Sequence, residues 1–314
     1  MLSRAEFRGG LLALGGLTAV VYLLISFSPG LPGEMLLQSL RFHIALGGIG
    51  LSALLALAGA RWRGLLLLLV TLASLAEGAQ LVAEQQRRRA VAEAPLRELS
   101  VLSYNVLTSN ARAEEAARHI AALAPDVAVI METPGIEPYL EDIAAALPHR
   151  VGCAETANCD LAILSRHPIV SGEVLPMWPF RFQRLVRAVL DVEGTPVTVV
   201  GVHLSKPYFD GASWSEALQV GRLLARQEGP VIVAGDFNAA AWSETLVWLG
   251  RHAELAPPPW YPASWPVRLG PLGVPIDNMF TRGNARILAI EAGAESYGSN
   301  HRYLLGTVGI YAAP

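Results

Sequence analysis

Charged residues are scarce in this sequence, and lysine and cysteine are almost absent. Of the 314 residues, 16% are charged and 52% are hydrophobic, and Lys206 is the only lysine among 24 basic residues. This composition is too apolar for an ordinary soluble enzyme. A formal net charge of -3 also excludes a strongly basic nucleic-acid-binding surface as the organising feature of the chain. The preference for arginine over lysine indicates a compositional bias of the source and carries no functional information.

The sequence has only two cysteines, Cys153 and Cys159, which lie six positions apart. So few cysteines, without a matching set of further ligands, argue against a zinc site. A pair this close could form a small disulfide loop in an oxidising compartment. The alternative is that they are two unrelated buried thiols. The sequence leaves both interpretations open.

Three long apolar runs occupy the first third of the chain, at residues 11–27, 42–60 and 64–82. A membrane-spanning helix needs about 20 predominantly apolar residues, and each run approaches that length. We therefore predict three transmembrane helices within residues 1–83, followed by a charged, alanine-rich connector over residues 84–98. A cleaved signal peptide is the alternative for the first run, but two further runs at short intervals argue against it.

The arginines that flank these runs give conflicting indications of orientation. Arg4 and Arg8 precede the first run, and Arg61 and Arg63 separate the second from the third. The positive-inside rule then places the N-terminus in the cytoplasm and, after three spans, the C-terminal domain outside it. The arginines at 87–89 follow the third run on that outer side and indicate the opposite orientation. We expect an extracytoplasmic C-terminal domain.

Residues 99–314 alternate between short apolar runs and amphipathic stretches, which is typical of a domain that mixes strands and helices. Strands are expected at 99–106, 127–131, 161–164, 186–192, 197–203, 231–234, 287–292 and 304–311, and helices at 111–123, 137–146 and 213–227. This pattern predicts an α/β fold in which two sheets pack together in the middle of a sandwich.

Polar side chains stand at the ends of these expected strands. They are Asn105, Glu132, His203, Asp236, Asn238, Asn300 and His301. Strand ends and the loops that follow them hold side chains rigidly around a shared cleft. Carboxylate and amide oxygens suit a hard divalent cation, and histidines and carboxylates suit proton transfer. The sequence therefore predicts a metal-assisted site at this edge of the domain.

The motifs around these residues resemble the endonuclease/exonuclease/phosphatase (DNase I-like) superfamily, and the apolar N-terminal runs resemble its membrane-anchored bacterial branch. The matching segments, in order, are Ser-Tyr-Asn-Val at 103–106, Met-Glu at 131–132, Asp-Leu-Ala-Ile-Leu-Ser-Arg at 160–166, Arg187, Gly-Val-His at 201–203, Gly-Asp-Phe-Asn at 235–238, Pro-Ile-Asp at 275–277 and Ser-Asn-His at 299–301. The resemblance implies a two-sheet α/β sandwich and a multi-pass protein of the bacterial cytoplasmic membrane.

The resemblance also implies an activity, hydrolysis of a phosphodiester by activated water with Mg²⁺ or Mn²⁺. The implied metal ligands are Asn105, Glu132 and Asn300; the implied catalytic residues are His203, Asp236, Asn238, Asp277 and His301; Arg187, Asn238 and His203 would bind substrate. The expected partners are a phosphodiester substrate (nucleic acid or a lipid headgroup) and the lipid bilayer, and no protein partner is evident.

The chain departs from the superfamily pattern where Asn300 replaces the aspartate before the last histidine. Asparagine keeps an oxygen but removes a negative charge, so the alternative function is a weakened or inactive binding module on a membrane anchor. Asn278 stands where a histidine often follows the aspartate of its motif, and the role of Asp160 stays open. The aromatic stretches 178–184 and 260–266 fit base stacking, a membrane interface or simple packing.

Overall fold

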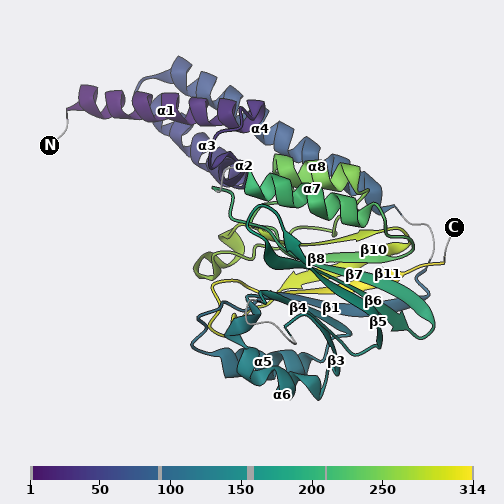
Figure 1. Ribbon diagram of the computed structural model, residues 1–314. Coiled ribbons are helices and arrows are strands. Elements are labelled where there is room, and N and C mark those ends of the chain that lie inside the picture. Colours follow the sequence, from purple (N-terminus) through teal and green to yellow (C-terminus); the bar gives the residue numbers. More distant parts are fainter. Residues whose placement is uncertain (1–2, 91–93, 154–158, 209–210, 313–314) are drawn as a thin grey trace.

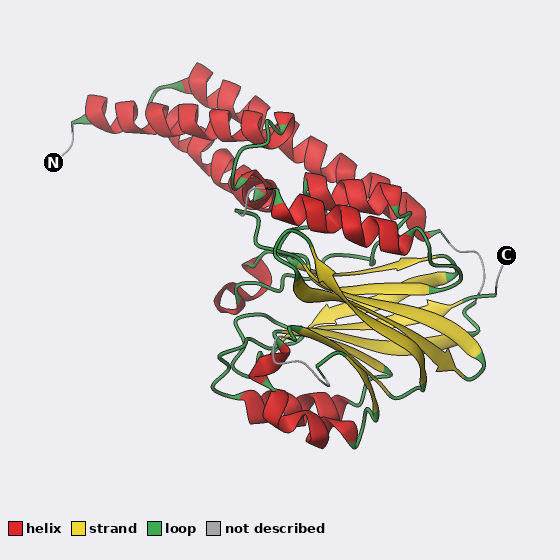
Figure 2. Cartoon of the chain, in the orientation of Figure 1, coloured by secondary structure: helices red, strands yellow, loops and turns green. Residues whose placement is uncertain are grey.

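A computed structural model describes residues 3–90, 94–153, 159–208 and 211–312. Figure 2 shows a helical arm that projects from a body of two sheets, with helices on both outer faces of the body. The sheets have the strand orders β10-β11-β1-β2-β4-β3 and β5-β6-β7-β8-β9. Each sheet contains one parallel pair, β1–β2 in the first and β7–β8 in the second, and its other neighbours are antiparallel.

The strands have the following bounds: β1 Arg97–Asn105, β2 Val127–Met131, β3 His149–Val151, β4 Leu161–Ser165, β5 Ile169–Met177, β6 Phe182–Val192, β7 Thr195–His203, β8 Val231–Asp236, β9 Asp277–Arg282, β10 Ala285–Ala292 and β11 Leu304–Ile310. The helices of the body are α5 Ala113–Leu123, α6 Leu140–Ala144, α7 Ala212–Leu224 and α8 Glu244–His252, with short 3-10 segments η2 Thr133–Gly135, η3 Glu137–Tyr139 and η4 Val267–Leu272.

The main core lies between the two sheets. Val129 and Ile163 of the first sheet pack with Val199 and Ile232 of the second, and all four side chains are fully buried. A second core fills the space between the β5–β9 sheet and helices α7 and α8, and a third lies between the other sheet and α5 with α6. The resulting order of layers, helix–sheet–sheet–helix, confirms the predicted α/β sandwich (Figure 1).

Sequence patterns missed three strands, β3, β5 and β9, and each lies at an edge of its sheet. β5 contains Gly172 and Pro176, residues that weaken a strand pattern but are tolerated at a sheet edge. β9 begins with Asp277-Asn278, polar residues that resemble a turn. Helix α8 was also unpredicted. Edge strands were therefore harder to identify than the buried central ones.

The helical arm consists of α1 Arg4–Phe27, α2 Glu34–Ser39, α3 Arg41–Leu57 and α4 Arg61–Gln86, which continues into the 3-10 segment η1 Arg87–Arg89. Among the described residues, two helices are long and apolar enough to cross a membrane by length and composition, Arg4–Phe27 and Arg61–Arg89, whereas α3 has 17 residues. The arm carries many outward apolar side chains. Leu57 is 85% exposed and Trp62 80%.

Polar contacts tie the three long helices of the arm together. Arg41, at the start of α3, is only 2% exposed and forms an ion pair of 2.7 Å with Glu77 of α4. Ser26 of α1 donates a hydrogen bond of 2.6 Å to the same carboxylate. The Tyr22 hydroxyl donates to the carbonyl oxygen of Ile44 at 3.0 Å. α1 is thus an integral part of the arm.

Candidate active site

The fold brings the ends of many strands to one rim of the sandwich. Parallel strands β1, β2, β7 and β8 all end there, and their antiparallel neighbours β4, β6, β9 and β11 begin there. The register places His203 beside Asp236 and Asp236 beside Asp277, in one row across β7, β8 and β9. This convergence positions polar groups that are distant in the sequence around a single site.

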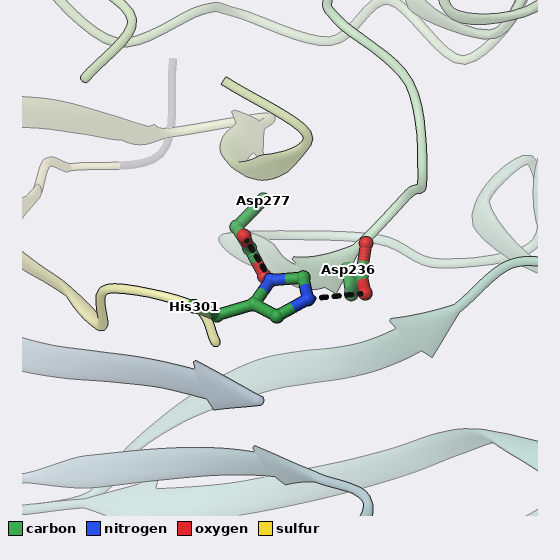
Figure 3. Close-up of side chains that lie close together, drawn as sticks. All are labelled: Asp236, Asp277 and His301. Atoms are coloured by element: carbon green, nitrogen blue, oxygen red, sulfur yellow. Dashed lines mark hydrogen bonds and ion pairs between the residues drawn. The ribbon is translucent and has the colours of Figure 1, made fainter. Parts of the chain in front are cut away.

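Two histidine–carboxylate pairs flank Asp236. His301 Nδ1 lies 2.8 Å from Asp277 Oδ2, and His203 Nδ1 lies 2.5 Å from Asp160 Oδ2. The opposite nitrogens of both rings point to the same atom: His301 Nε2 is 3.8 Å and His203 Nε2 is 3.7 Å from Asp236 Oδ2. Figure 3 shows the His301 ring between Asp277 and Asp236. One carboxylate therefore lies between two imidazoles, each backed by another carboxylate.

Burial and neighbouring charge control the protonation of this cluster. Burial lowers the pKa of His301, but Asp277 and Asp236 outweigh it and raise that pKa to about 9. For His203, Asp160 likewise overcomes burial and raises the pKa. Burial, together with repulsion from Asp277, raises the pKa of Asp236. The two imidazoles thus favour the charged form, and Asp236 is more basic than an ordinary aspartate.

Asn105 and Glu132 occupy the neighbouring sheet, at the ends of β1 and β2. The Asn105 amide nitrogen donates to Glu132 Oε1 at 3.2 Å and to Asp236 Oδ2 at 3.1 Å, so it lies between two carboxylates. Glu132 Oε2 accepts a hydrogen bond of 2.7 Å from the Thr108 N–H. Burial alone would raise the pKa of Glu132, but the Thr108 and Asn105 donors lower it. Glu132 is therefore held as a charged carboxylate.

In the Gly-Asp-Phe-Asn segment at the end of β8, the backbone conformation explains why glycine stands at 235 and asparagine at 238. Gly235 has a φ of +151°, and a Cβ there would collide with the carbonyl of Val202 on the adjacent strand. Asn238 has a φ of 51°, and its N–H donates to Asp236 Oδ1 at 2.8 Å. Its side-chain nitrogen donates to the Leu204 carbonyl at 2.8 Å. Asp236 and Asn238 are thus fixed to one another and to the end of β7.

The two residues that depart from the superfamily pattern have different surroundings. Asn300 is exposed beside His301, and its backbone carbonyl oxygen accepts from the Val267 N–H at 3.1 Å. Asn278 is buried, and its amide nitrogen donates to the Ala239 carbonyl at 2.9 Å. Asn278 therefore supports the loop after β8, whereas the side chain of Asn300 is open to solvent.

The structure does not bring Arg187 to the cluster. Its guanidinium donates to Gln227 at 2.8 Å and lies 3.3 Å from a carboxylate oxygen of Glu173. Arg184, three positions earlier on β6, instead forms an ion pair of 3.3 Å with Asp160. Residues three apart on a strand point to opposite faces, so only one of the two arginines can face the site.

Sequence reasoning missed Arg184 as a member of this cluster and left the role of Asp160 open. Both line a cavity of about 540 Å³ together with Phe180, Phe182 and Cys159. The Arg184 guanidinium lies 4.7 Å from the centre of the Phe182 ring. Cys159 is disulfide-bonded to Cys153. The only available sequence signals were the arginine-rich aromatic stretch and the aspartate that opens the β4 motif.

Two sets of residues could hold a divalent cation. Asp236, Asp277 and His301 offer ligand atoms within 4.8 Å of one another. However, His301 Nδ1 is engaged by its 2.8 Å hydrogen bond to Asp277, and the raised pKa of His301 means that a cation at Nε2 would have to displace a proton from that nitrogen. Glu132 offers carboxylate oxygens without that conflict, and the Asn105 amide nitrogen occupies the space between Glu132 and Asp236. The Asn105 side-chain oxygen accepts from the Leu107 N–H at 3.1 Å, so the amide would have to turn to offer that oxygen to a cation. Hard oxygen ligands of this kind suit Mg²⁺.

The two-sheet sandwich and the residues gathered at the ends of its strands are those of the DNase I-like superfamily. The model of the Endonuclease/Exonuclease/phosphatase family matches residues 102–301, and the chain belongs to that family. No curated protein matches the chain.

Solved structures share the fold at low sequence identity. Sphingomyelinase C from Streptomyces griseocarneus is 20% identical, with 67% of this chain and 99% of that one covered and a TM-score of 0.53. TDP2 from D. rerio, complexed with a single-strand DNA product, is 17% identical, with 68% and 99% covered and a TM-score of 0.56. Beta toxin from Staphylococcus aureus with bound magnesium ions is 13% identical, with 69% and 100% covered and a TM-score of 0.54.

Proposed function

We propose that this protein is a membrane-anchored, divalent-metal-dependent phosphodiesterase that uses water as its nucleophile. The observation that carries the proposal is the central position of Asp236 between two imidazoles, each backed by a carboxylate. A buried carboxylate with a raised pKa is suited to accept a proton from water, and two cationic imidazoles suit a phosphate with developing charge. Membership of the endonuclease/exonuclease/phosphatase family supports hydrolysis of phosphate esters in general.

Each side chain has a role that its contacts support. Asp236 orients and deprotonates the attacking water, and Asn238 holds an oxygen of the phosphate beside it. His301, fixed by Asp277, donates a proton to the leaving oxygen. His203, fixed by Asp160, contacts the phosphate. Arg184 takes the place predicted for Arg187, because it lines the cavity that adjoins this pair and is able to bind the ester.

Glu132 and Asn105 would hold the cation, Mg²⁺ or Mn²⁺. Such an ion, when bound, polarises a phosphoryl oxygen and offsets its charge. The lowered pKa of Glu132 supports this assignment, because the carboxylate is charged without the ion. Asn300 would add a neutral oxygen from the loop before His301. Among the structures with this fold, beta toxin has bound magnesium ions.

The position of the arm favours a phosphodiester in a lipid headgroup over long duplex DNA. α1 and α3 project from the end of the body at which α2 lies (Figure 1). η4 joins that end to the site: Val267 donates to the Asn300 carbonyl at 3.1 Å, and the Leu272 carbonyl lies 2.9 Å from His43 of α3. Leu272 is 70% exposed. If the apolar helices lie in a bilayer, the site is close to the membrane surface.

We place the C-terminal domain outside the bacterial cytoplasmic membrane. The bond between Cys153 and Cys159 is of a kind that persists in oxidising compartments. The arginines that conflicted with this orientation have structural partners: Arg88 donates to the Leu255 carbonyl at 2.8 Å and Arg89 to the Ile287 carbonyl at 3.2 Å. Docking onto the domain accounts for these two arginines without reference to membrane orientation.

The competing function is a binding module without catalysis. Asn300 is the one observation in its favour, because a carboxylate is missing from the loop before His301. Against it, the remaining site residues make the specific contacts expected of working groups, including both histidine–carboxylate pairs. A site that no longer catalyses would be under no constraint to keep them.

Metal removal gives the most direct test of the proposed function. Full-length protein in detergent micelles should hydrolyse bis(p-nitrophenyl) phosphate with Mg²⁺ or Mn²⁺. After EDTA treatment the rate should fall at least about 100-fold, because charge on the phosphoryl oxygens is no longer offset, and added Mn²⁺ should restore it. Undiminished hydrolysis in EDTA would contradict the metal-dependent mechanism, and no hydrolysis under any condition would favour the binding module.

Asn300→Asp tests the effect of the missing carboxylate. If Asn300 belongs to the metal site, the added negative charge should tighten Mn²⁺ binding on the order of 10-fold, as changes around metal ligands commonly do. Isothermal titration with Mn²⁺ would measure this. The matched control is Asn284→Asp, in the turn between β9 and β10, at the end of β9 opposite to Asp277. Equal Mn²⁺ affinity in Asn300→Asp and wild type would remove Asn300 from the metal site.

A further inference from the structure

The loop that follows the Asp236–Asn238 turn is closed over by the helical arm. Residues 239–241 and Ser243 are completely buried. This loop has no regular secondary structure before α8, so its buried backbone groups need partners from elsewhere. Several of those partners belong to α2 and α4, helices that lie outside the family match at residues 102–301.

Two residues at the end of α2 bind the loop directly. The Ser39 hydroxyl accepts a hydrogen bond of 3.0 Å from the Ala240 N–H. The Gln38 carbonyl accepts one of 3.0 Å from the Trp242 indole N–H. The Gln38 side-chain oxygen accepts one of 2.9 Å from the Glu244 N–H. α2 therefore satisfies three donors within five residues, and the first of them is two positions after Asn238.

Helices α3 and α4 complete this contact. Gln85 of α4 donates to the Ala241 carbonyl at 2.7 Å. The Phe42 ring of α3 packs edge-on against Trp242, with 4.7 Å between ring centres. Phe42 also packs in a cluster with Ile276, the residue that precedes Asp277. The arm thus touches both chain segments that carry the carboxylates around His301.

We propose that the arm is a positioning element of the active site as well as an anchor. Ser39 and Gln38 are positioning residues: they hold the loop so that Asn238 and Asp236 stay aligned with Asp277. This inference rests on the proposed phosphodiesterase function. A shift of about 1 Å in a catalytic group can cost on the order of 100-fold in rate, so a modest movement of this loop would be measurable.

The Ser39→Ala variant of the full-length protein in detergent micelles tests the proposal. It removes the acceptor for one buried N–H without adding bulk. Ser52→Ala is the matched control, because Ser52 is also buried in the arm but donates only within α3, to the Gly48 carbonyl. Gln85→Leu is a second variant, in which the loop loses its donor from α4 and the Tyr261 hydroxyl loses its acceptor. Each is assayed with bis(p-nitrophenyl) phosphate and Mn²⁺, and hydrogen–deuterium exchange is followed in the peptide spanning 237–244.

The expected result for Ser39→Ala and Gln85→Leu is a kcat about 10-fold lower with KM within about 3-fold, and faster exchange confined to 237–244. Ser52→Ala should match wild type in kcat, in KM and in the exchange rate of residues 237–244. Wild-type kcat and wild-type exchange in both loop variants would overturn the proposal. So would faster exchange of the loop with unchanged kcat, since the arm would then hold the loop without affecting catalysis. An inactive wild type would instead overturn the phosphodiesterase function, and the exchange data would still show whether α2 holds the loop.

Discussion

Replacing Asp236 with alanine is expected to lower kcat for phosphodiester hydrolysis by about 10³-fold, the range seen when a positioned acid–base group is lost. Asp236 is 1% exposed, and its Oδ2 faces His203 and His301. No other carboxylate occupies this central position among the described residues of the cluster, so water would lose its base. KM should change little, because Arg184 and the cavity remain.

Two further variants make the Asp236 result interpretable. Asp236→Asn keeps the acceptor for the Asn238 N–H but removes the charge, so it should lose nearly as much activity while the turn stays intact. Asp142→Ala changes an exposed aspartate of α6 and should retain wild-type rates. Steady-state kinetics with Mn²⁺ give both constants. A fall of less than about 10-fold in Asp236→Asn would show that Asp236 is not the base.

The central strands and most of the site were predictable, because both depend on local pattern. β2 and β8 are short, continuous apolar runs followed at once by Glu132 and by the Asp236–Asn238 turn. An acidic residue directly after a buried apolar run shows where that strand ends, and this can be read from the sequence without knowing the neighbouring strands. The edge strands β5 and β9 carry no such signal. A strand paired with only one neighbour tolerates glycine and proline, as in β5, and β9 begins with the polar pair Asp277-Asn278.

The partner of His203 and the arginine of the site could not be derived from the sequence. Asp160 immediately precedes β4 in one sheet, and His203 is the last residue of β7 in the other. Their 2.5 Å contact depends on how the two sheets pack, which no motif spacing records. The choice between Arg184 and Arg187 depends on which face of β6 is turned to the site. The β6–β7 register settles it, by pairing Leu185 with Val202 and so bringing Arg184 opposite the end of β7.

The contact of the arm with the active-site loop was also invisible in the sequence. Residues between the first two apolar runs resemble an ordinary connection, and α2 has only six residues. The role of Gln38 and Ser39 follows from their hydrogen bonds to Ala240 and Trp242, about 200 positions away in the sequence. Apolar runs predict helices through composition alone, whereas docking depends on individual buried backbone groups. For this reason an isolated domain beginning near residue 95 is a poor substitute for the full chain in activity assays.

The second large effect is expected at His301, where His301→Asn should lower kcat by about 10²- to 10³-fold because the leaving oxygen loses its proton donor. Its matched control is His167→Asn. His167 also contacts an aspartate, with Nε2 at 3.2 Å from Asp126, but it lies outside the site. Steady-state rates with Mn²⁺ at pH 7 would measure both. Equal losses in the two variants would indicate a general effect on folding.

Asp277→Asn separates the acid role of His301 from a purely structural one through the pH profile. The pKa of His301 is raised to about 9, so the protonated ring predominates below that pH and is lost as pH rises through it. The wild-type rate should therefore fall above about pH 9. Burial opposes the charged ring, and Asp277 is the largest of the groups that favour it. Without that charge the pKa of His301 should drop toward or below the ordinary histidine value of about 6.5, so the rate should fall at a correspondingly lower pH. If the rate of Asp277→Asn falls at the same alkaline pH as that of the wild type, His301 is not the titrating acid. This holds even if Asp277→Asn and His301→Asn are both slow.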